Sequence, residues 1–162
     1  MEFTLPTHTG MVNDWAGVVP DSAERMLEVT LRLVRTLTEG EIAVVTMSTL
    51  PGGTPQQMAQ RIGNEWGVGA RTGRARQAGA VVLLVPKETS SDGRGHCRIE
   101  LGTGASAFIA DSAATTICES AVPAFRVQDY SKGLSRIVEE LARRYVVALG
   151  FAKSPMTPRQ KS

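Results

Sequence analysis

The stretch Gly79-Ala80-Val81-Val82-Leu83-Leu84-Val85 decides the fold class of this chain. A short, uninterrupted apolar run is typical of a strand that is covered on both faces of a sheet. It is the clearest central strand in the sequence, and the remaining elements are arranged around it.

Four segments before and after this strand carry helix or strand patterns. Asp21 and Glu24 resemble a capping box, and apolar residues at helical spacing follow them until Gly40 ends the helix. Residues 42–47 form a short run rich in β-branched residues, which predicts a buried strand. Thr54 caps a second helix, with proline at the first helical position and Gln57 at the third. Residues 96–101 alternate enough to return as the second strand of a hairpin.

Two helices complete the predicted order. Asp111 caps a helix that Pro123 ends, and a last helix runs from about Ser131 to Leu149. Strands separated by helices favour parallel pairing, whereas a hairpin adds an antiparallel neighbour. The expected fold is therefore an α/β protein, a three-layer α/β/α sandwich with a small mixed sheet and helices on both faces.

Length and composition indicate one soluble globular domain. The chain has 162 residues, of which 42% are hydrophobic and 21% charged, within the range of roughly 100–200 residues for one domain. We expect an N-terminal extension over residues 1–10, the domain over 11–151, and a C-terminal tail or linker over 152–162. No apolar run approaches the roughly 18 residues of a membrane span.

Charge and motifs exclude several classes of ligand. The chain carries 18 basic and 16 acidic residues, which is too balanced for a dedicated nucleic-acid binder. Gly102 to Ala107 fits a glycine-rich dinucleotide motif, but it follows a hairpin strand and lacks the acidic ribose ligand of a first βαβ unit. We expect a tight turn there, no nucleotide cofactor and no nucleic-acid partner.

Cys97 and Cys118 have no spacing that is typical of a zinc site. Two buried, unpaired thiols are the simplest interpretation, and they leave the redox compartment open.

Standard catalytic motifs are missing, so the catalytic residues are unknown. His8 lies in the extension, and His96 lies in a predicted strand, where a structural role is expected. Asp14 and Asp129 stand out as loop carboxylates close to helix starts, where they could bind Ca2+ or Mg2+ or cap the helices. A glycine-rich loop carries three arginines that could contact an anion or an acidic partner, or could simply be solvated: Arg71, Arg74 and Arg76.

Several pieces in the same order resemble the TPM domain family. They include residues 12–19 (VNDWAGVV), 41–46 (EIAVVT), 66–69 (WGVG), 79–85 (GAVVLLV), 98–104 (RIELGTG), 109–111 (IAD), 123–126 (PAFR) and 129–134 (DYSKGL). The resemblance covers residues 12 to about 149 and implies an α/β/α sandwich. It also implies an extracytoplasmic setting with a membrane anchor, so the chain is expected to be a soluble fragment with a protein partner at or near a membrane. The family includes thylakoid-lumen proteins that are linked to photosystem II repair, acid phosphatases and proteins that bind divalent cations.

The sequence departs from the family pattern at the position of one expected ligand. The family has Asp-Asn-Gly before the central strand, and here the residues are Gln77-Ala78-Gly79. The family aromatic between two glycines is replaced by Thr103, and the usual acidic residue after that motif by Ser106. Losing a carboxylate weakens a hard-cation site, which predicts a weak or vestigial Ca2+ or Mg2+ site that includes Asp14 and Asp129.

Two functions follow from the resemblance. The first is an extracytoplasmic accessory or interaction domain of a membrane-anchored protein. The alternative is a metal-assisted acid phosphatase that acts on phosphomonoesters. Hairpin geometry should bring Gly102 to Ser106 beside Arg74 to Gly79, and the family pattern suggests that the loops of Asp14 and Asp129 join this corner.

Overall fold

The computed structural model describes residues 3–73, 75–90 and 92–150. Within them a four-stranded sheet has the order β1 (Val12–Asp14), β2 (Glu41–Thr46), β3 (Gly79–Val85) and β4 (His96–Leu101). β1 and β3 both pair with β2 in parallel, and β4 pairs with β3 in antiparallel orientation. The predicted mixed sheet with one hairpin is confirmed.

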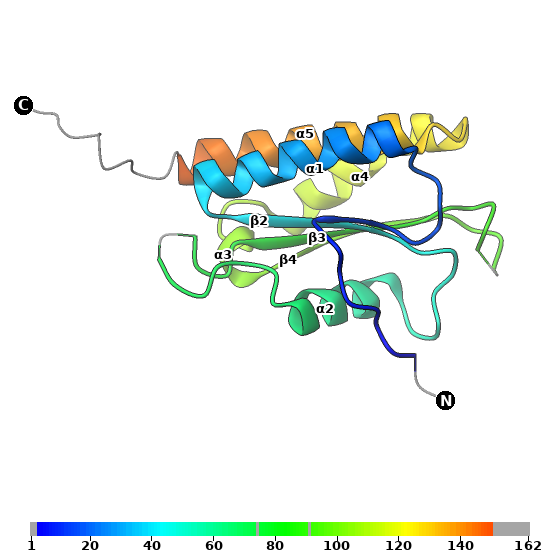
Figure 1. The fold of residues 1–162 in the computed structure, drawn as a ribbon, viewed down its shortest axis with the longest axis horizontal. Helices are drawn as coiled ribbons and strands as arrows, with labels where there is room; N and C mark the ends of the chain where they lie inside the picture. The colour runs from blue at the N-terminus through cyan, green and yellow to red at the C-terminus, as the bar shows by residue number, and fades with distance from the viewer. Residues whose placement is uncertain (1–2, 74, 91, 151–162) are drawn as a thin grey trace, which may run out of the picture.

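Helices cover both faces of this sheet (Figure 1). α1 (Asp21–Thr38), α4 (Asp111–Arg126) and α5 (Tyr130–Leu149) form one layer, and α2 (Pro55–Trp66) lies on the other face. Every residue of β3 is buried, because its even-numbered side chains pack under the three-helix layer and its odd-numbered ones pack against α2. The three-layer α/β/α sandwich expected from the sequence is therefore the observed architecture.

Two short elements were not expected from the sequence. β1 has only three residues and pairs with β2 over Val12 to Asp14, so it is too short to show an alternating pattern. α3 (Thr103–Ser106) is a single turn that follows β4.

Helix ends also differ from the sequence expectations. Thr54 and Gln57 form the predicted capping box of α2. Asp21 and Asp111 are instead the first helical residues of α1 and α4. The N-cap positions before them are occupied by Pro20 and Ala110, and neither makes a side-chain capping hydrogen bond. The first helix was expected to end at Gly40; its C-cap is Glu39, one residue earlier, in a left-handed conformation with φ 69°.

Pro123 lies inside α4 and does not end it. A proline removes one backbone hydrogen bond and usually bends a helix. The last turn nevertheless continues to Arg126, where the Phe125 ring stacks on Tyr130 at 5.7 Å between ring centroids. This tertiary contact favours the additional turn.

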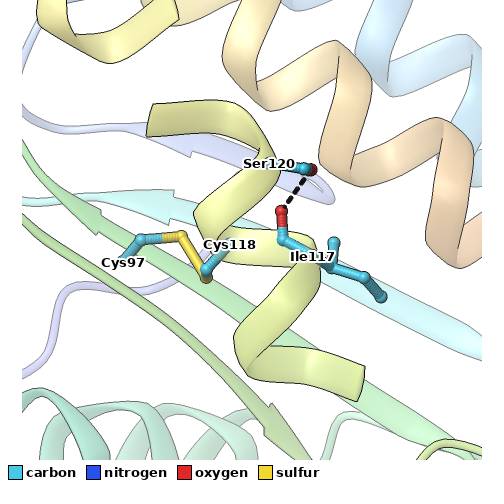
Figure 2. Close-up of a disulfide and its surroundings, with 4 residues drawn as sticks. All are labelled: Cys97, Ile117, Cys118 and Ser120. Carbon is cyan, nitrogen blue, oxygen red and sulfur yellow. Dashed lines mark hydrogen bonds between the residues drawn. A yellow bond between two sulfur atoms is a disulfide. The ribbon is translucent and has the colours of Figure 1, made fainter. Parts of the chain in front are cut away.

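Cys97 and Cys118 form a disulfide, so the prediction of two unpaired thiols is wrong. Figure 2 shows the bond joining β4 to α4, in the same turn of α4 as the hydrogen bond that Ser120 Oγ donates to the Ile117 carbonyl at 2.7 Å. The two Cα atoms are 5.9 Å apart, within the range that disulfides require. The pairing depends on α4 packing over β4, which no local spacing in the sequence reveals.

The N-terminal segment packs beside α2. The Trp66 indole donates a hydrogen bond to the Pro6 carbonyl at 3.3 Å, and its ring lies 5.1 Å from His8. The expected C-terminal tail, residues 152–162, lies outside the described residues. No helix among those described is both long enough and apolar enough to cross a membrane.

Candidate functional site

The parallel strands give the sheet two distinct ends. Asp14 and Thr46 lie opposite each other at the carboxyl ends of β1 and β2, close to the end of β3. Glu41 and Gly79 lie opposite each other at the amino ends of β2 and β3. With a rise of about 3.3 Å per residue, the five residue steps of β2 separate these ends by roughly 17 Å.

Asp14 lies at the carboxyl end, and both of its carboxylate oxygens are engaged. Oδ1 accepts from Val18 N at 3.0 Å and from the Thr46 hydroxyl at 2.6 Å, and Oδ2 accepts from Val19 N at 2.8 Å. These bonds fold the segment between β1 and α1 back on itself. Asp14 is therefore a structural acceptor, and a cation would have to compete with three donors for it.

Asp129 is the N-cap of α5, where its side chain accepts from Lys132 N at 3.2 Å. Capping was the alternative to cation binding for this residue. A capping carboxylate also complements the positive end of the helix dipole, which gives Asp129 a structural role whether or not it binds a cation.

Beside Asp129, the buried Tyr130 hydroxyl donates a hydrogen bond to the Glu88 carboxylate. This bond is the main cause that holds the pKa of Glu88 below its ordinary value. Burial, followed by the hydrogen bond and charge of Glu88, raises the pKa of Tyr130 to about 12. The pair links the segment after β3 to the start of α5.

The glycine-rich segments meet at the other end of the sheet. Gly102 N donates to the Gly79 carbonyl at 2.8 Å, and Gly104 N donates to the Gln77 carbonyl at 2.9 Å. The Thr103 hydroxyl donates to the Gln77 side chain. A Cβ atom at Gly104 would overlap the Arg76 carbonyl, so the motif serves close backbone packing. Its amides bond to neighbouring backbone and do not form a phosphate cradle.

The four loops therefore do not form one corner. Gly102 to Ser106 and the segment before Gly79 meet as expected, but Asp14 lies at the opposite end of the sheet. Asp129 is also at that opposite end, because its neighbour Tyr130 contacts Glu88 after β3. The expectation that position 77 faces the two aspartates is wrong, since parallel strands place the start of β3 and the end of β1 at different ends.

The arginine loop belongs to the glycine-rich end. Arg71 and Arg76 are exposed, and residue 76 forms an isolated bridge with Ala70. Arg74 lies outside the described residues. Neither Arg71 nor Arg76 forms an ion pair within the described part of the chain, so the loop presents two unpaired cations to solvent.

A cavity that sequence reasoning missed opens at the carboxyl end of β3. It has a volume of about 630 Å3 and lies between the β3–β4 hairpin and the turn that joins α4 to α5. Apolar side chains such as Leu84 and Phe125 line it together with Lys87, Arg126 and Tyr130. Its lining residues belong to four separate elements, β3, β4, α4 and α5, so no single motif predicts it. The only signal in the sequence is that two family-like segments lie close together, at residues 123–126 and 129–134.

Neither end shows a preformed metal site. Within the described residues, no three His, Cys, Asp or Glu side chains gather closely enough to hold a metal ion together. The donor set also fits poorly, since hard cations prefer several oxygens that are available for coordination and those of Asp14 already accept three hydrogen bonds.

The order of the strands in the sheet and the helical layers on both of its faces define the class of protein as a small α/β/α sandwich domain. The chain belongs to the TPM domain family, whose model matches residues 12–144. The family resemblance read from the sequence is confirmed.

Solved structures share this fold. The N-terminal domain of a P. gingivalis protein has 25% identity and a TM-score of 0.74, over 90% of this chain and 88% of that one. The N-terminal domain of the cg2496 protein from Corynebacterium glutamicum has 16% identity and a TM-score of 0.64, over 99% and 97% of the two chains. The BA42 protein of the psychrophilic bacterium Bizionia argentinensis has 14% identity and a TM-score of 0.62, over 83% and 86%. No curated protein matches the chain.

Proposed function

We propose that this TPM domain is an accessory or interaction domain of a membrane-anchored protein and works in an extracytoplasmic compartment. The observation that carries the proposal is the disulfide between Cys97 and Cys118. Disulfides persist in oxidising compartments and are rare where glutathione and thioredoxin keep thiols reduced. A domain of this size can form a sufficient hydrophobic core without a disulfide. The bond is therefore better explained by an oxidising compartment than by a requirement for extra stability.

The accessory role is supported by the engagement of the two candidate aspartates. Asp14 binds two backbone amides and a hydroxyl, and Asp129 caps α5. A hard cation must displace such donors or share the same oxygens, which weakens binding. In this proposal the domain binds Ca2+ or Mg2+ weakly, and its main task is contact with a protein partner near the membrane.

The redox state of the cysteines in the cell tests the compartment. Cells that produce the full-length protein are quenched in acid, and their thiols are alkylated with a maleimide polymer before and after reduction. The proposal expects Cys97 and Cys118 to be protected until a reductant is added. Alkylation of both without reduction would contradict an extracytoplasmic location.

Calorimetric titration with CaCl2 separates the accessory role from the alternative metal-assisted phosphatase. We expect affinity weaker than micromolar and no turnover of an aryl phosphate at mildly acidic pH. Tight binding and turnover that are both lost in Asp14→Asn and Asp129→Asn would favour the phosphatase. Turnover that survives both changes would indicate a contaminating enzyme.

A further inference from the structure

We propose that the cavity at the carboxyl end of β3 binds a small amphipathic monoanion, an apolar body that carries one carboxylate. The cavity of about 630 Å3 lies between the β3–β4 hairpin and the α4–α5 turn. Sites for small molecules generally measure about 300–1,000 Å3, with mainly apolar walls and a few polar groups that fix orientation.

The walls suit an apolar body. Leu84 lies near the end of β3 on the face that α4 covers, and Val122 and Phe125 line the cavity from α4. The Phe125 ring stacks on Tyr130, with 5.7 Å between centroids and 28° between planes. Such a wall of aliphatic and aromatic side chains gains from covering an alkyl chain or a ring, because both lose contact with water.

The disulfide holds this wall in place. Cys97 lines the cavity from β4, and its bond to Cys118 fixes the distance between β4 and α4 (Figure 2). A cavity between two elements that are covalently joined is formed before the ligand arrives, so less ordering entropy is lost on binding.

The polar side of the cavity favours a negative charge. Lys87 and Arg126 are exposed, line the cavity and form no ion pair among the described residues. Arg126 is the last residue of α4, where a basic side chain could bond to the final carbonyls of the helix, but two of these carbonyls already accept backbone hydrogen bonds. Val127 N donates to the Ala124 carbonyl at 3.2 Å, and Gln128 N donates to the Phe125 carbonyl at 3.0 Å. The guanidinium is therefore available to a ligand, and its planar fork fits a carboxylate.

The charged side chains around the cavity balance one negative charge on a ligand. Glu88 also lines the cavity, where it accepts the Tyr130 hydroxyl, and His96 is paired with Asp92 at 3.1 Å. Lys87, whose charge also helps to lower the pKa of Glu88, and Arg126 together outnumber this carboxylate by one positive charge. One carboxylate neutralises this excess, whereas a dianion such as a phosphomonoester would bring a second negative charge that no cation of the cavity compensates. The ligand class thus differs from the substrates of the phosphatase alternative.

Titration of the isotope-labelled protein with three probes of equal chain length tests the charge requirement. Decanoate is the anion, decanol the neutral analogue and decyltrimethylammonium the cation, and amide shifts at Cys97 and Phe125 report binding. We expect decanoate to bind at least about fivefold more tightly than decanol, and the cation to bind most weakly. Equal affinities for the three probes, or tighter binding of the cation, would overturn the proposal.

Variants locate the site. Arg126→Glu should weaken decanoate binding by at least about tenfold, because it removes an attraction and adds a repulsion. The matched control is Arg143→Glu, which makes the same charge change on an exposed side chain of α5 outside the cavity and should leave the affinity unchanged. Val122→Trp should fill the cavity and abolish binding of decanoate and decanol. Equal effects of the two arginine variants, or full binding in Val122→Trp, would place the ligand elsewhere.

Discussion

Removal of the Cys97–Cys118 disulfide should destabilise the domain by a predictable amount. The bond closes a loop with a sequence separation of 21 residues. The loop-closure entropy that such a bond removes from the unfolded chain corresponds to about 3.3 kcal/mol at 25 °C, near the middle of the usual range. With an m value of about 2 kcal/mol per molar urea, the unfolding midpoint should fall by about 1.6 M.

Urea unfolding of the wild type, Cys118→Ala and Cys97→Ala/Cys118→Ala provides the measurement. Because one substitution already breaks the bond, the single and the double variant should lose nearly the same stability, and their effects should not add. Reductant should lower the wild type to the level of the variants and leave the variants unchanged. A double variant that is much less stable than Cys118→Ala, or two thiols that titrate in the oxidised wild type, would refute the bond and with it the argument for an oxidising compartment.

Four further changes test other parts of the structure. Asp14→Asn leaves one acceptor oxygen for three donors and should reduce the free energy of unfolding by about 1–3 kcal/mol in urea titration. Gly104→Ala should cost more than about 2 kcal/mol in the same assay, because its Cβ overlaps the backbone before β3. Tyr130→Phe removes the donor that depresses the pKa of Glu88 in the folded protein, so an NMR titration should show that pKa rising towards 4.5. The hydrogen bond from Tyr130 to Glu88 stabilises the fold fully above the unfolded-state pKa of Glu88, and this contribution is lost as pH falls through its folded-state pKa. The free energy of unfolding of Tyr130→Phe should therefore fall less on acidification than that of the wild type. Gln77→Asp should change calcium affinity less than about twofold in calorimetry, because position 77 lies at the far end of the sheet from Asp14.

The sequence predicted the elements whose pattern is local. β3 is a continuous apolar run, and the capping box of Thr54 and Gln57 lies within four residues. β1 escaped prediction because it has three residues and owes its conformation to pairing with β2. Pro123 was predicted to end α4 because its local effect is unfavourable, but packing of Phe125 against Tyr130 opposes that effect.

The candidate site was harder to predict because it depends on distances between segments. The contact between Gln77 and the turn after β4 follows from the hairpin, which is a local feature. The placement of Asp14 requires knowing that β1 runs parallel to β3, and β1 itself was not expected. The disulfide and the cavity likewise require α4 to lie over β4, which no residue spacing encodes.

The complete burial of β3 also shapes how the unfolded chain behaves. In the folded domain its two edges are paired and both faces are covered. In the unfolded chain the same seven residues, Gly79 to Val85, carry no charge and no proline, which is the composition of segments that stack into cross-β aggregates. The nearest charged residues are Arg76 and Lys87, which flank the segment as gatekeepers. Heating should therefore lead to irreversible β-aggregation, and urea, which keeps the exposed strand in solution, should allow the domain to refold.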